Sequence, residues 1–405
     1  GGGAGGMPQR ASMAEPLTLG VIYLLVCLYA LTYAMQAPAL PFVLSNLGAE
    51  GSAEFSKLAT FFSAIQLVGG LAAGPLKDRF GGRALLCVSF VCSALCYGMT
   101  GAATTLSHLY LSRVWTAGQH AMMGARTLLV DLSAPEDRPV LLGRVYLAYA
   151  VGATLGPTLG GGLAGVSLTL GAYVAAGLCL AAAALCALLP AGAAVAAGKD
   201  KGGGKEPGAG GAGGGGLLGP LAQPGVLGLL MVKAGAEFAG AIVQAMLPVV
   251  LTEHMQQDAA STGMVFSFLG AANAVVQGVL IGIFTSRFSE AAIVRMALVG
   301  AAAAYAGLAL SGSLVQLLVV LLPITLAAAL FGNVTSSMLT RFVPSSMSGS
   351  IVALDMSVGS ALGIVAPGAG ALVLSRGGVP ALGAVCASTF LVLALAAPVR
   401  AHKVD

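Results

Sequence analysis

GPLKDRFGGRALL, residues 74–86, places four charges, three glycines and a proline in a chain in which only 8% of residues are charged. Apolar runs flank it on both sides, at residues 58–73 and 87–103. The stretch therefore joins two segments that avoid water. What it does depends on what those segments are.

The composition is that of a membrane protein. Of the 405 residues, 57% are hydrophobic and the mean hydropathy is +0.92, whereas soluble domains contain about 45–50% apolar residues with glycine included. A membrane-spanning helix needs about 20 mostly apolar residues. Twelve segments satisfy this requirement, which predicts twelve transmembrane helices at 18–44, 55–76, 83–104, 106–131, 141–164, 168–189, 225–251, 261–285, 290–311, 314–342, 347–374 and 379–398.

A Gly-rich, Lys-containing stretch at 190–224 divides these segments into six and six, and its composition predicts a flexible linker. The predicted halves are residues 17–189 and 225–399. Residues 1–16 are interpreted as a disordered tail without the features of a secretory signal, and residues 400–405 as a short C-terminal tail. No soluble domain is expected.

Lysine and arginine resist translocation, so their distribution predicts orientation. With a cytosolic N-terminus, the outer loops hold only Lys57 and Arg376, and the inner loops and tail hold Lys77, Arg79, Arg83, Arg138, Arg144, Lys199, Lys201, Lys205, Arg287, Arg295, Arg341, Arg400 and Lys403. Both termini are therefore predicted to be cytosolic. The net charge of +4 reflects this bias, and no nucleic-acid partner is expected. All seven cysteines fall in apolar spans, so we expect no disulfide framework, metal site or cofactor.

The two halves share landmarks at one spacing. GPLKDRF begins at Gly74 and a weaker copy, GIFTSRF, begins 208 residues later at Gly282. Pro157 and Pro367 are 210 residues apart, and Pro135 and Pro344 are 209 apart. A duplicated six-helix unit is typical of transporters whose site lies between the halves.

The chain resembles the major facilitator superfamily, whose loop between helices 2 and 3 has the form G-x-L-x-D-R-x-G-x-R. The matching residues are Gly74, Leu76, Asp78, Arg79, Gly81 and Arg83. GPTLGG in the fifth span resembles the element of the proton-coupled drug antiporter branch, at Gly156, Pro157, Gly160 and Gly161. Longer strings at 131–144 and 288–295 are similar to organic cation transporter-like members of solute carrier family 22. The resemblance implies an all-α facilitator fold and exchange of small organic compounds, cationic or drug-like, for protons.

The opening stretch is interpreted as a cytosolic turn with a gating role. Gly81 and Gly82 are expected to adopt positive φ. The resemblance implies that Asp78 meets a helix N-terminus and basic groups of a neighbouring loop, which would lock an inner gate; the alternative is a solvated loop charge. Small residues in the fifth span allow close helix approach. The predicted gating set is Gly74, Asp78, Arg79, Gly81, Arg83, Gly156, Pro157 and Gly160.

Polar groups inside the spans are candidates for function because an unpaired buried charge is costly. The predicted substrate path, which the resemblance places on helices 1, 4, 7 and 10, is Tyr29, Tyr33, Gln36, Arg113, His120, Lys233, Glu237 and Asn333. Each has a structural alternative. The tyrosines either hold a cation on their rings or pack, His120 alone favours a structural role, and Lys233 with Glu237 forms either a neutral pair or a proton-coupling site. Arg126 can extend to the interface, and Asp355 is a further carboxylate in the eleventh span.

These observations predict a secondary active transporter that works by proton antiport and alternating access, with a small organic substrate, protons and lipid as partners. A facilitative uniporter of a metabolite or sugar is one alternative, and a membrane scaffold without transport is another. No nucleotide-binding or nucleophile motif occurs, so an enzyme is not expected. A monomer is favoured.

Overall fold

The computed structural model describes residues 16–134, 137–189, 219–344 and 347–396, and these ranges contain helices and no strand. Most of the predicted linker, both predicted tails except for Pro16, and the landmark Pro135 lie outside the described residues. The all-helical architecture that the sequence predicted is confirmed.

The first half contains nine helical elements among its described residues. In chain order they are α1 (Pro16–Ala34), α2 (Leu40–Asn46), α3 (Ser52–Gly101), α4 (Leu106–Val114), the 3₁₀ turn η1 (Trp115–Gly118), α5 (Ala121–Leu132), α6 (Arg138–Val166), α7 (Leu170–Leu185) and η2 (Cys186–Leu188).

The second half follows the same plan. Its described elements are η3 (Gly219–Ala222), α8 (Val226–Val249), the π-helical turn η4 (Val250–His254), α9 (Ala259–Val275), the π-helical turn η5 (Val276–Leu280), α10 (Ile281–Arg287), α11 (Glu290–Ala309), α12 (Leu314–Arg341) and α13 (Ser348–Ala396).

Ten helical stretches among the described residues are long and apolar enough to cross a membrane. One of them, Ser350–Ala396, is broken at Gly378, where φ is 63°, and so provides two crossings. Residues 106–132 add another crossing that is divided between α4, η1 and α5. The described residues thus provide twelve stretches that can cross a membrane, which agrees with the twelve apolar segments of the sequence.

Two predicted helices are not continuous. The first was expected to run from 18 to 44, but α1 ends at Ala34 and α2 starts at Leu40. Pro38 and Pro41 lie in this region, and proline lacks the N–H that a helix interior requires. The fourth was expected to run unbroken from 106 to 131, but it breaks after η1, where Gly118 packs against the side chain of Cys92.

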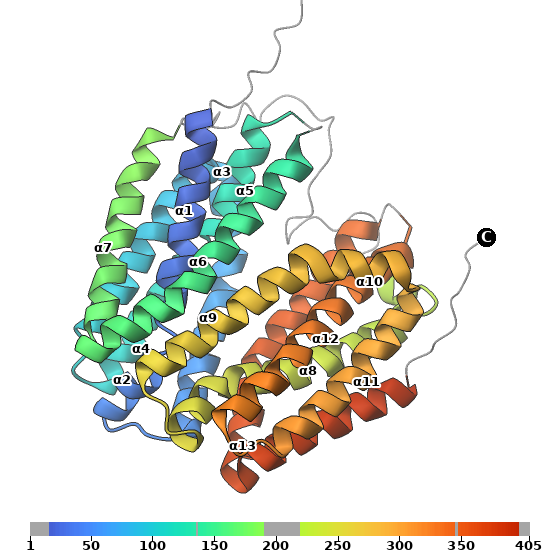
Figure 1. Cartoon of the computed structure of the whole chain (residues 1–405). Coiled ribbons are helices and arrows are strands. Elements are labelled where there is room, and N and C mark those ends of the chain that lie inside the picture. Colours follow the sequence, from blue (N-terminus) through green and yellow to red (C-terminus); the bar gives the residue numbers. More distant parts are fainter. Residues whose placement is uncertain (1–15, 135–136, 190–218, 345–346, 397–405) are drawn as a thin grey trace, which may run out of the picture.

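The halves meet along two pairs of helices. In Figure 1, α9 of the second half lies beside α6 of the first half, and α13 packs against α3. Hydrogen bonds cross both seams: Thr158 Oγ1 donates to Ser267 Oγ at 2.7 Å, and Thr60 Oγ1 donates to the Ile364 carbonyl at 3.0 Å. These contacts hold the two halves together at one end of the molecule.

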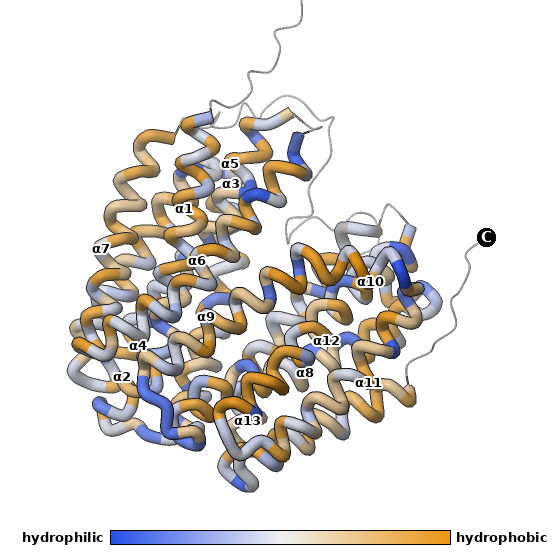
Figure 2. Tube along the Cα trace, in the orientation of Figure 1, coloured by the Kyte–Doolittle hydropathy of each residue, from blue (hydrophilic) through white to orange (hydrophobic). Residues whose placement is uncertain are grey.

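The outward faces of the helices remain apolar. Leu180 of α7, Val299 of α11 and Val319 of α12 are each more than half exposed, and Figure 2 shows hydrophobic residues along the outer helices of both halves. Such a surface is unfavourable in water and suits contact with lipid chains.

Candidate functional site: a cavity between the two halves

A cavity of about 790 Å³ lies between the halves. The first half contributes residues of α1, α3, α5 and α6, and the second half contributes the first part of α13. Its volume falls within the range of small-molecule sites, about 300–1,000 Å³. Its polar and aromatic lining includes Tyr29, Tyr33, Phe62, Ser63, Gln66, Lys77, His120, Arg126, Thr127, Tyr149, Ser357 and Ser360.

Aromatic rings form one wall of this cavity. Tyr29 and Tyr33 are four residues apart on α1, so they share a helix face, and both line the cavity. The Tyr29 hydroxyl donates to the Gln119 carbonyl at 2.8 Å, and the rings of Tyr33 and Phe62 lie 6.3 Å apart. The wall is thus fixed by a hydrogen bond and by ring packing between α1 and α3.

His120 reaches the cavity because the helix is broken there. It precedes the first residue of α5 and has non-helical backbone angles, φ −119° and ψ 39°. Its backbone N–H donates to Ser89 Oγ at 3.1 Å, which replaces a helical bond. Its Nε2 atom is buried and has no hydrogen-bond partner. The sequence predicted His120 as a path residue, but a continuous helix over 106–131 did not show the break that brings this imidazole to the cavity.

Arg113 is the most unusual charge of the first half. Its side chain on α4 is only 6% exposed, yet Nε and Nη2 have no hydrogen-bond partner. The remaining Nη1 donates to Cys96 Sγ at 3.8 Å, and no carboxylate among the described residues forms an ion pair with it. Arg113 is not among the residues that line the cavity.

The second half contains a compensated ionic cluster instead. Lys233 of α8 binds both carboxylate oxygens of Asp355 on α13 and donates to Ser336 Oγ of α12 at 2.8 Å. Glu237, one turn along α8, lies 3.4 Å from the same ammonium. The lysine side chain is 4% exposed, so its charge is balanced within the protein. Asp355, which the predicted path omitted, is its nearest partner; a lone carboxylate in an apolar span was the available signal.

Five residues of the predicted path, Arg113 among them, do not line the cavity, and two of the five belong to this cluster. The Glu237 carboxylate lies beside Gly359 of α13, behind the residues that line the cavity. Asn333 of α12 donates to Gln277 of η5 at 3.2 Å. Gln36 lies in the turn after α1, and its buried Nε2 has no partner.

The chain turns sharply between the two parts of α3. Gly81 has φ 79° and ψ 171° and is the break between two helices. The expectation of positive φ at Gly82 was wrong: Gly82 is helical, and a Cβ there would lie 2.6 Å from the Gly124 carbonyl of α5. Gly82 is therefore required for close packing. The loop of several residues that the sequence suggested is reduced to one residue.

The other residues of the predicted gating loop differ in their surroundings. Arg79 lies over the ring of Phe80, and Arg83 donates to the Ala187 carbonyl at 3.3 Å. Gly74 is helical, with open space where a Cβ would point. Asp78 is in the helix, but its side chain lies outside what the structure describes.

The GPTLGG element of α6 packs closely against neighbouring segments on two of its faces. A Cβ on Gly156 or Gly160 would lie 2.5 Å from the Leu31 carbonyl or 2.1 Å from the Met35 carbonyl, so this face packs on α1 and its turn within the first half. Gly161 faces the second half instead, where a Cβ would lie 2.3 Å from the Ala259 carbonyl. Gly263 of α9 likewise approaches the Pro157 carbonyl. The inter-half seam uses Pro157 and Gly161.

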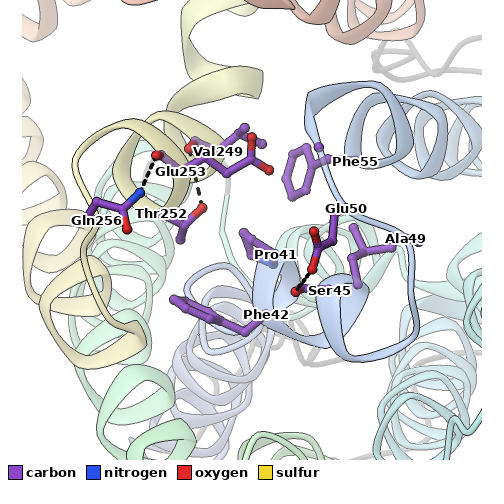
Figure 3. Close-up of a pocket in the computed structure, with 12 residues that line it drawn as sticks. Pro41, Phe42, Ser45, Ala49, Glu50, Phe55, Val249, Thr252, Glu253 and Gln256 are labelled. Atoms are coloured by element: carbon purple, nitrogen blue, oxygen red, sulfur yellow. Dashed lines mark hydrogen bonds between the residues drawn. The ribbon is translucent and has the colours of Figure 1, made fainter.

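A second cavity, of about 590 Å³, lies at the opposite end of the molecule. Figure 3 shows Phe42, Glu50 and Phe55 of the first half facing Thr252 and Glu253 of η4, the turn that follows α8. Glu50 accepts a hydrogen bond from Ser45 at 2.9 Å. Each half thus contributes one carboxylate to a cavity at the junction between them.

Two pseudo-equivalent six-helix halves, a chamber between them and a seam at one end define a membrane transport protein. The Major Facilitator Superfamily pattern matches residues 22–367, and the chain belongs to this family.

Known proteins agree with this assignment. Solute carrier family 22 member 18 of Mus musculus is 29% identical over 375 residues, which is 90% of this chain and 91% of that protein. The tetracycline resistance protein, class D, of Salmonella ordonez is 25% identical over 72% of this chain and 73% of its own length. A bacterial homologue of the human lysosomal transporter Spinster has the same fold, with a TM-score of 0.74 at 17% identity over 95% of this chain and 96% of that chain. The resemblance to the major facilitator superfamily that the sequence motifs indicated is confirmed.

Proposed function

We propose that this protein is a secondary active transporter that exchanges a small organic compound for protons by alternating access. The observation that carries the proposal is the 790 Å³ cavity, whose walls come from both halves. At one end of the molecule the two halves are held together by contacts between α3 and α13 and between α6 and α9. A rocking motion of the halves about this cavity would expose it alternately to the two sides of the membrane. The drug-resistance name of one relative is in line with a drug-like substrate.

The proposed orientation follows from the charges. With both termini and the linker on the cytosolic side, Lys77 and Arg126 lie at the cytosolic end of the cavity. The cavity then opens to the cytosol, and the seam between α6 and α9 closes the outer side. We further propose that Asp78 takes part in gating, so that Asp78→Asn is expected to slow cycling while substrate binding persists.

The proposed proton site is the cluster of Lys233, Asp355 and Glu237. Two carboxylates share the one ammonium, and Glu237 is the most exposed of the three groups, at 34% for its side chain. A proton that arrives at Glu237 would weaken its attraction to Lys233 and so alter the packing of α8 against α13. Because the cluster lies directly behind the cavity wall on α13, such a change would reach the substrate.

The substrate that fits the aromatic wall is a compound with an aromatic body. The resemblance to organic cation transporter-like carriers implies a positive charge on it, and the faces of Tyr29 and Tyr33 can attract a cation. The uniporter and the non-transporting scaffold are the competing functions.

The test uses the purified full chain in proteoliposomes and a panel of aromatic drugs, with an imposed pH gradient. We expect uphill accumulation that a protonophore abolishes. Flux that ignores the gradient would indicate a uniporter, and absence of flux for every compound would indicate a scaffold. Glu237→Gln is expected to keep substrate–substrate exchange and lose gradient-driven accumulation; equal loss of both would remove Glu237 from proton coupling.

A further inference from the structure

His120 has a ring nitrogen that the protein leaves without a partner. Its backbone is fixed, since the N–H donates to Ser89 Oγ at 3.1 Å, but Nε2 of the imidazole is buried and has no hydrogen-bond partner. Gly70 of α3 lies against the ring, where a Cβ would be 3.6 Å from His120 Cε1. A buried polar atom without a partner is uncommon in folded proteins. The structural role that the sequence favoured for His120 therefore leaves its ring unexplained.

The ring lies beside the aromatic wall of the central cavity. His120 and Tyr29 both line this cavity, and the Tyr29 hydroxyl donates to the carbonyl of Gln119, the residue before His120. Tyr33 continues the wall one turn further along α1. A cation on these tyrosine faces, as proposed above for the substrate, would lie close to the imidazole. A charge on His120 would act on it directly.

The groups around His120 include cations, while none of the described residues that line the cavity is acidic. α13 contributes the neutral Ser357 and Ser360 to the wall, and its Asp355 is bound to Lys233. A proton on His120 would therefore add positive charge to a lining that contains no described carboxylate. The titratable and charged groups on the other elements around the ring are Tyr29 and Tyr33 of α1, Lys77 and Cys92 of α3, Arg113 of α4, Arg126 of α5 and Tyr149 of α6.

Among the described lining residues, His120 is the one whose side-chain type changes charge between about pH 5 and 8. Lysine and arginine remain charged in this range, and tyrosine remains neutral. The cluster of Lys233, Asp355 and Glu237 does not line the cavity, so its effect on a substrate needs a change in packing. Exchange of a cation for a proton requires that the two do not stay bound together. His120 is placed to exclude one by the other without a movement of helices.

We infer that His120 is a second proton site, at which the proton and a cationic substrate exclude each other by charge. The neutral imidazole admits the cation to the faces of Tyr29 and Tyr33, and a proton bound at Nε2 repels it. Return of that proton to water frees the wall for the next cation, and no other bond changes. The inference rests on the proposed exchange function and assigns part of its coupling to the cavity itself.

The decisive measurement is the pH dependence of binding for two radiolabelled ligands of one shape. The cation (2-naphthyl)trimethylammonium keeps its charge at every pH, and 2-tert-butylnaphthalene is its neutral isostere. On the purified full chain between pH 8 and pH 5, we expect the cation to lose affinity by about fivefold or more, and by no more than about tenfold per pH unit, the limit for displacing one proton. The affinity for the isostere should change by less than about twofold, because a proton on His120 repels only a charged ligand.

Variants then test the residue. His120→Gln keeps a polar side chain without a titratable ring, so its affinity for the cation should stay near the wild-type value at pH 8 over the whole range. His120→Lys places a permanent charge there and should bind the cation weakly at every pH. His108→Gln is the matched control and should keep the wild-type pH dependence, because His108 is an exposed residue of α4 that lines neither of the two cavities.

A pH dependence that survives in His120→Gln would overturn the inference, and so would a wild-type affinity for the cation that does not change with pH. An equal loss for the isostere would overturn it as well, since pH would then act on the shape of the cavity. Loss of the pH dependence in Glu237→Gln but not in His120→Gln would assign the exclusion to the cluster.

Failure of the cation to bind at any pH would also overturn the inference. The comparison of the two ligands on the wild type stands even where a variant does not fold. The transport proposal falls separately, only when no compound of the proteoliposome panel is moved.

Discussion

The two halves share a backbone plan and differ in where they place charge. Thr105 caps α4 and Ser313 caps α12, 208 residues later, with identical angles of φ −139° and ψ 157°. Cys179 contacts Thr32 and Cys386 contacts Ala239 across the same separation of 147 residues. The helices of both halves therefore pack on the same frame.

The polar residues do not follow this repeat. Leu321 and Ala328 stand 208 residues after Arg113 and His120, and Val26 stands 207 residues before Lys233. The first half thus has an unpaired cation and an aromatic wall, while the second half has a closed ionic cluster. Two halves with the same scaffold can carry different polar residues because helix packing depends on small and apolar residues. The few polar positions can therefore differ between the halves without changing the packing.

The largest expected effect comes from breaking the cluster of the second half. Lys233→Ala leaves Asp355 and Glu237 without their counter-charge in a poorly hydrated site. The expected loss is about 3 kcal/mol of unfolding free energy, the low end for a broken buried pair because both carboxylates are partly exposed. Denaturant titration in detergent measures it. The double variant Lys233→Met/Asp355→Leu is the control and should recover most of the loss; no recovery would mean that packing, not charge, caused the effect.

The next prediction separates the two faces of α6. Gly161→Leu would collide with the Ala259 carbonyl across the seam, so the halves should separate at that end while the first half stays folded. Gly156→Leu collides within the first half and should lower its stability instead, by about 2–3 kcal/mol in the range of overpacked sites.

Cysteines introduced at Thr60 and Ile364, which are hydrogen-bonded across the other seam, report separation by loss of disulfide cross-linking. Cross-linking should fall in Gly161→Leu more than in Gly156→Leu. If cross-linking fell more in Gly156→Leu, the face of α6 that holds the halves together would be the one that carries Gly156, which would contradict this prediction.

Replacing Arg113 should change the unfolding free energy in the opposite direction to replacing Lys233. Replacing an uncompensated buried cation by leucine, which is shorter but apolar, is expected to raise the unfolding free energy by about 1 kcal/mol, since the desolvation penalty is removed. Thermal unfolding of ligand-free protein checks this. A destabilised Arg113→Leu would show that the guanidinium is paired, and the contrast between the halves would disappear.

The smallest expected effect comes from removing the helix caps that the two halves have in common. Thr105→Ala and Ser313→Ala each remove a side-chain acceptor from a backbone N–H, that of His108 or Gln316. Each should cost about 0.5–1 kcal/mol, and the two losses should agree within error. Clearly unequal losses would mean that the two caps, although identical in backbone angles, contribute differently to the unfolding free energy.

Much of the fold could be predicted from local sequence. The apolar lengths located the crossings, but the first span is interrupted near the prolines at 38 and 41, and the fourth breaks where Gly118 packs against Cys92 of α3, a contact between distant residues. Of the candidate path, Tyr29, Tyr33 and His120 line the cavity. Asn333 does not, because membership of a helix does not determine which of its faces meets the cavity, and Gln36 does not, because it lies in the turn after α1.

By itself the sequence determined that this chain has twelve apolar spans in two halves, with a charged turn after the second span. These properties depend on hydrocarbon thickness, on the cost of polar residues in lipid and on short-range backbone preferences, all of which act within one segment. Only the tertiary structure decided that Lys233 pairs with Asp355, 122 residues away, that Arg113 has no carboxylate partner among the described residues, and that Gly161 rather than Gly156 meets the other half. The partner of a buried charge is set by how distant helices cross, and no single segment contains that information.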